Sequence, residues 1–63
     1  MNTQVMSAIR KDFIANHLRS QLVSLQIILY AIEEQNKVDC DYTHESLKEI
    51  ETHLRQLRKL CVN

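Results

Sequence analysis

The sequence predicts an all-α protein: an antiparallel hairpin of a long first helix and a shorter second helix, which dimerises into a four-helix bundle. Glycine and proline are both absent from the 63 residues, and these residues normally build hairpin turns, phosphate-binding loops and strained catalytic turns. Apolar residues make up 44% of the chain and charged residues 25%, which suits amphipathic helices and argues against disorder. A chain of this length forms a single domain, residues 1–63, without room for a cofactor cleft.

The second helix, predicted over about residues 43–61, has the clearest pattern. Its apolar residues recur at steps of three and four, which keeps one seam facing a partner helix. This seam consists of Leu47, Ile50, Leu54, Leu57 and Cys61. Thr43 is the expected N-cap and Asp41 the competing one, because a short polar side chain can accept a free backbone N–H there. Acidic residues in the first half and basic residues in the second complement the helix dipole.

The first helix is predicted over about residues 3–35 and ends where Asn36 can take the left-handed conformation. It carries a seam of the same spacing, formed by Leu18, Leu22, Leu25, Leu29 and Ile32. We expect the two seams to pack together through a loop over residues 36–42. The alternative is a break near residues 15–17 that gives three shorter helices, because the apolar phase shifts after Phe13.

The first helix also has a second apolar face. At about 100° per residue it lies opposite the leucine seam, and its members are Val5, Met6, Ile9, Phe13, Val23, Ile27 and Tyr30. A contiguous exposed apolar patch marks an association surface, and a lone two-helix hairpin of this size buries too little to be stable. We therefore expect a homodimer in which the first helices pack on each other. The alternative occupant of this face is a different protein.

Candidate catalytic and metal-binding residues are few. The histidines His17, His44 and His53 match neither the spacing of a structural zinc site nor the HExxH motif. Cys40 could join His44 and the neighbouring aspartates at the loop, but no second pair of ligands stands at zinc spacing. We therefore expect no enzymatic activity, no metal and no cofactor.

The two cysteines are expected to be free thiols. The predicted helix over residues 43–61 would by itself hold Cys40 and Cys61 about 27 Å apart at about 1.5 Å per residue, whereas a disulfide needs Cα atoms within about 7 Å. Free thiols suit a reducing compartment, the N-terminus lacks the features of a secretory signal, and the apolar run over residues 22–32 is too short for a bilayer. The expected location is the cytoplasm, without a membrane partner.

These features favour a small non-catalytic protein-interaction module. We expect a dimeric adaptor, chaperone or inhibitor-type regulator that binds another protein through the second apolar face of the first helix. The alternative is a dimeric hairpin bundle that binds structured RNA or other nucleic acid through Arg10, Lys11 and Arg19. Eight Lys/Arg against eight Asp/Glu weaken this alternative, since phosphate binding needs several cationic contacts.

Overall fold

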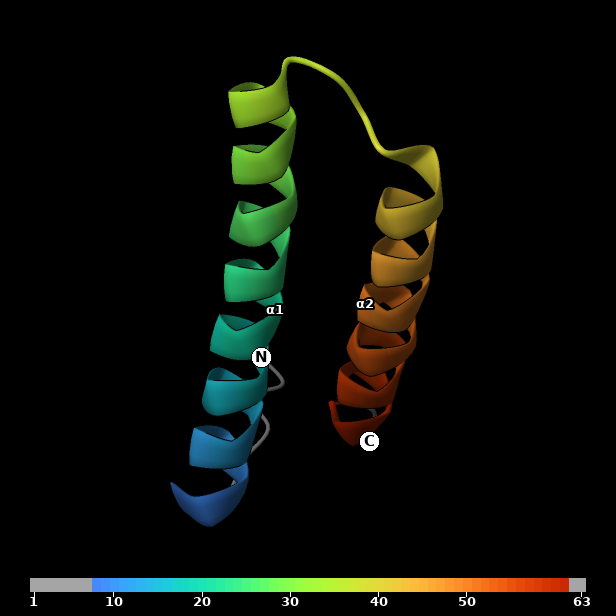
Figure 1. Ribbon diagram of the computed structural model, residues 1–63. Coiled ribbons are helices and arrows are strands. Elements are labelled where there is room, and N and C mark those ends of the chain that lie inside the picture. The colour runs from blue at the N-terminus through green and yellow to red at the C-terminus, as the bar shows by residue number, and fades with distance from the viewer. Residues whose placement is uncertain (1–7, 62–63) are drawn as a thin grey trace, which may run out of the picture.

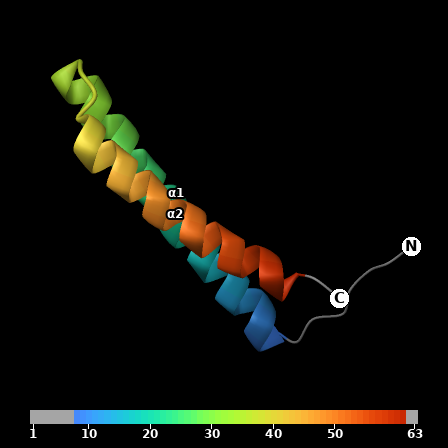
Figure 2. The ribbon, with the colours of Figure 1, turned by 90° about the vertical axis from the view of Figure 1, so that its right-hand side faces the viewer.

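In a computed structural model, which describes residues 8–61, the chain is two helices joined by a short loop (Figure 1). α1 spans Ala8–Gln35 and α2 spans Cys40–Leu60. The two helices lie side by side and run antiparallel, as both views show (Figures 1 and 2). The predicted all-α hairpin, with a long first helix and a shorter second one, is confirmed. The predicted helix start near residue 3 lies outside the described residues.

α1 is a single uninterrupted helix. It passes through residues 15–17 without a break, so the three-helix alternative is wrong. It ends at Gln35, where Asn36 has a φ of 55°. An asparagine tolerates this left-handed conformation better than most residues, because its short polar side chain can form local hydrogen bonds. The predicted role of Asn36 in ending the helix is confirmed.

α2 begins at Cys40, earlier than the predicted start at Thr43. The N-cap is Asp39, whose carboxylate accepts a hydrogen bond of 3.2 Å from the backbone N–H of Tyr42. The backbone N–H of Thr43 donates to the Asp39 carbonyl at 2.9 Å, so Thr43 lies within the first turn. Asp41 also lies within this turn, where its charge complements the helix dipole. Neither Thr43 nor Asp41 is the cap, and the loop is shorter than the predicted residues 36–42.

Removing the Asp39 cap is expected to destabilise the protein. An Asp39→Ala variant should lose about 1 kcal/mol of unfolding free energy, because a backbone N–H of the first turn loses its acceptor. Urea unfolding followed by circular dichroism measures this loss. An Asp41→Ala variant, at an exposed position of the same turn, is the matched control and should lose less. Equal losses at the two positions would contradict the assignment of Asp39 as the cap.

The core between the helices is small. Among the described residues the buried apolar side chains are Ile28, Ile50 and Leu57, and none is less than 2% exposed. Gln21 is also buried, at 7% exposure. The rest of the inner face is half-buried and mostly short or polar, with members such as Ile14, His17, Ser24, Ala31, Thr43, Ser46 and Leu60. The two helices therefore bury little apolar surface against each other.

The predicted inner seam of α1 is wrong. Leu18, Leu22, Leu25 and Leu29 are between 41% and 55% exposed, and of that seam only Ile32 is half-buried. The stripe that meets α2 instead passes through Gln21 and Ile28, roughly a quarter turn away around the helix axis. Both stripes follow steps of three and four, and α1 is apolar on several sides. The spacing therefore could not identify which stripe α2 covers.

The predicted seam of α2 is correct for only two residues. Ile50 and Leu57 are buried at 5% and 7% exposure. Leu47 and Leu54 are 38% and 37% exposed, and Cys61 is exposed as well. These three residues lie beside the contact rather than within it, because the contact also includes short polar residues of the neighbouring stripe.

Candidate functional site

The leucines left out of the contact between the helices gather on one side of the hairpin. They are Leu18, Leu22, Leu25 and Leu29 of α1 with Leu47 and Leu54 of α2, and we call this set the leucine face. One groove shows that both helices contribute to the same side, since it is lined by Ile14, Leu18, Leu54, Leu57, Arg58 and Cys61. Because residues at steps of three and four lie on the same face of a helix, the remaining leucines of each stripe lie on that side as well.

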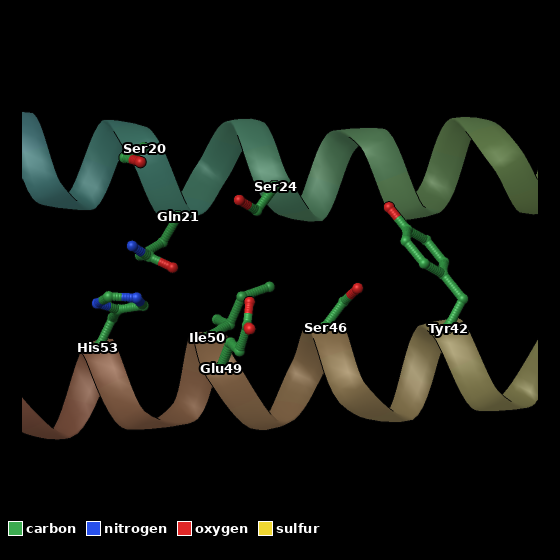
Figure 3. A pocket seen from close by; sticks show the side chains of 8 residues that line it. All are labelled: Ser20, Gln21, Ser24, Tyr42, Ser46, Glu49, Ile50 and His53. Carbon is green, nitrogen blue, oxygen red and sulfur yellow. The ribbon is translucent and has the colours of Figure 1, made fainter.

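The opposite side of the hairpin is polar. A shallow cleft there is lined by Ser20, Gln21, Ser24, Tyr42, Ser46, Glu49, Ile50 and His53 (Figure 3). Figure 3 shows the Gln21 side chain reaching from α1 toward α2. No side-chain nitrogen or oxygen among the described residues is both buried and without a partner, so the Gln21 amide reaches solvent through this cleft. Sequence reasoning missed the cleft because its residues are scattered over two helices and form no motif.

The polar side chains of the cleft form no hydrogen-bonded cluster within the described residues. Nucleophilic catalysis needs a hydroxyl and a base within hydrogen-bond reach. In the described part of the chain, the cleft serines, Glu49 and His53 share no hydrogen bond. No group of three or more His, Cys, Asp or Glu residues between residues 8 and 61 could hold a metal ion. The cleft is a polar flank of the hairpin and contrasts with the leucine face.

The interaction residues predicted on the first helix form a separate apolar surface. Within the described residues they are Ile9, Phe13, Val23, Ile27 and Tyr30, all exposed, and we call them the outer face. Val5 and Met6 lie outside the described residues. The Phe13 ring packs on His17, with ring centroids 4.2 Å apart. At the end opposite the loop, which we call the open end, α1 extends past α2 (Figure 1). Ile9 lies in the first turn of α1 and therefore on this overhanging arm.

The histidines and cysteines lie apart from one another. His17 is half-buried on α1, whereas His44 and His53 are exposed on α2. Cys40 is the first residue of α2 rather than a loop residue, and Cys61 caps the other end of that helix rather than entering the core. Both thiols are free, as predicted. Because α2 separates them by about 31 Å at about 1.5 Å per residue, they cannot bridge within one chain.

The basic residues of the nucleic-acid alternative point in different directions around α1. Arg10 and Arg19 are roughly 180° apart at about 100° per residue, and Lys11 lies between these directions. The Arg19 guanidinium donates a 3.0 Å hydrogen bond to the Asn16 side-chain oxygen. Phosphate binding needs several cations on one surface, and these three residues do not share one face of α1.

The fold and its two apolar surfaces define a helical hairpin with surplus apolar area. Comparisons with models of protein families, with curated proteins and with solved structures found no match. Neither α1 nor α2 carries an apolar stretch that could bridge a bilayer.

Proposed function

We propose that this chain is a non-catalytic interaction module that works as a homodimer and binds another protein through the outer face of α1. Such a module would serve as an adaptor, a chaperone or an inhibitor-type regulator. The observation that carries this proposal is that Ile9, Phe13, Val23, Ile27 and Tyr30 stay exposed although α1 is packed against α2. The proposed location is the cytoplasm, where both thiols would stay reduced.

The spacing of the outer face indicates the kind of partner. Val23, Ile27 and Tyr30 stand at positions i, i+4 and i+7. Ile9 and Phe13 form an i, i+4 pair nearer the N-terminal end of α1. A helix with this spacing binds by laying its anchors into an apolar groove. Phe13 and Tyr30 supply the large aromatic contact area that is enriched at binding hot spots. We therefore expect a partner with an apolar groove rather than a charged surface.

Site-specific photocrosslinking tests the outer face. A photoreactive phenylalanine analogue at position 27 should capture the partner in cells, and the same analogue at the exposed α2 position Gln56 should not. Adding Tyr30→Asp to the position-27 probe should reduce capture by about 30-fold, the loss expected for a hot-spot contact of about 2 kcal/mol. Capture of the same proteins from both positions, or only of further copies of this chain, would contradict the proposed protein-binding role.

A further inference from the structure

We propose that a second copy of this chain covers the leucine face and packs antiparallel to the first, so that the loop end of each hairpin meets the open end of the other. This inference rests on the homodimer of the proposed function and adds its surface and its orientation. The outer face of each α1 stays available to another protein in this arrangement.

One hairpin alone lacks a second layer. The molecule is one layer of two helices (Figures 1 and 2), whereas a stable domain encloses its core between two packed layers. The leucine face spans both helices, since it includes Leu18 of α1 and Leu54 of α2 in one groove. A partner that is itself a two-helix layer can cover both leucine stripes at once. A second hairpin supplies that layer and gives a four-helix bundle.

The leucine face is also self-complementary. On α1, Leu22 and Leu25 flank the point between residues 23 and 24, and Leu18 and Leu29 lie symmetrically further out. A twofold interface pairs residue i with residue j and j with i. An axis through this point therefore sets Leu22 against the partner's Leu25 and Leu18 against the partner's Leu29.

The leucines of α2 follow the same symmetry. Leu47 and Leu54 flank the point between residues 50 and 51. In the cleft, Gln21 and Ser24 of α1 share a lining with Ile50 and His53 of α2, so the two midpoints lie at about the same level along the hairpin. One twofold axis perpendicular to the helices can therefore pass through both midpoints. This axis pairs α2 with the partner's α2 and sets Leu47 against the partner's Leu54.

The two ends of the hairpin also differ in charge. The loop end is acidic, with Lys37 among Glu33, Glu34, Asp39, Asp41 and Glu45. The open end is basic, with Asp12 among Arg10, Lys11, Arg55, Arg58 and Lys59. A twofold axis parallel to the helices would bring the two basic ends together. The perpendicular axis brings each basic end onto an acidic end, and such complementarity fixes orientation by penalising like-charge contacts.

The two cysteines report on this orientation. Cys40 and Cys61 stand at equal steps on either side of the α2 midpoint. In the antiparallel dimer Cys40 therefore lies beside the partner's Cys61, at both ends of the bundle. With the parallel axis, α2 would lie over the partner's α1 and no two cysteines would meet. A Cys40–Cys61 bridge is also intermolecular by necessity, since one helix holds the two about 31 Å apart.

The experiment combines solution mass with crosslinking of the full chain. Light scattering should give twice the 7.4 kDa of one chain. Diamide, which takes up the two protons and two electrons released per disulfide, or a short bis-maleimide should then join Cys40 to Cys61 between chains, as mapped by mass spectrometry of the digested dimer. Cys40→Ser and Cys61→Ser variants should stay dimeric by light scattering, and each should lose the crosslink.

The possible failures separate the two proposals. A monomer at every concentration up to about 100 μM would overturn both the homodimer and its orientation. A dimer that neither reagent crosslinks, or one in which a single-cysteine variant still crosslinks, would overturn the antiparallel packing and leave the homodimer standing. Crosslinks at the photoprobe in position 27 bear only on the outer face and its partner.

Discussion

A Leu22→Asp variant is expected to convert the dimer into a monomer. Leu22 lies next to the proposed twofold axis, so each dimer would bury two carboxylates against the partner's Leu25. Burying a charge without a partner costs several kcal/mol per ion. We expect the dissociation constant to rise at least about 1000-fold, which corresponds to about 4 kcal/mol. Sedimentation equilibrium over a wide concentration range measures the change.

The neighbouring residue provides the matched control for this variant. Val23→Asp introduces the same charge one position along α1, but Val23 belongs to the outer face and is exposed. The mass of this variant should match that of the unmodified dimer, while its capture of a protein partner should fall. If Val23→Asp gives a monomer and Leu22→Asp does not, the outer face is the self-interface and the leucine face is not.

Truncation of Ile50 is expected to cause the largest loss of stability within the hairpin. Ile50 is 5% exposed, and removing a buried side chain of this size costs about 2–5 kcal/mol because a cavity remains. A domain of this size has roughly 3–9 kcal/mol of total stability at about 0.05–0.15 kcal/mol per residue. Ile50→Ala should therefore leave a large part of the population unfolded at room temperature.

Urea unfolding followed by circular dichroism measures this effect. All variants must be compared at one protein concentration, because the stability of a dimer depends on concentration. Ile9→Ala is the control, since Ile9 is 83% exposed and exposed substitutions stay within about 0.5 kcal/mol. An equal loss for the two variants would show that the contact between α1 and α2 does not depend on Ile50.

The elements of the fold were predictable from local signals. The absence of glycine and proline and the regular apolar spacing predicted two helices, and Asn36 marked the end of the first because its side chain suits the left-handed conformation. The start of the second helix was less defined. Asp39, Asp41 and Thr43 are all good capping residues, and sequence alone gave no reason to choose Asp39.

The packing of the helices was not predictable from spacing. The stripe through Leu22 is more apolar than the stripe through Gln21, so a rule that buries the most apolar stripe selects the wrong contact. The structure instead leaves the leucines of both helices on one side, where together they form a broader surface than either stripe. The spacing within one chain does not indicate this surface, because in the proposed dimer it becomes buried only when a second hairpin covers it. The outer face stays a prediction, since exposure does not identify an occupant.

The scarcity of buried side chains has a consequence for the abundance of the protein. If the leucine face supplies most of the apolar burial, a lone hairpin is close to the unfolding threshold, and folding and pairing become one step. The folded fraction then rises with the total amount of chain. Newly made or diluted chains would be open to proteases, whereas paired chains would be protected. The protein would then either accumulate as the dimer or be degraded as the unfolded chain.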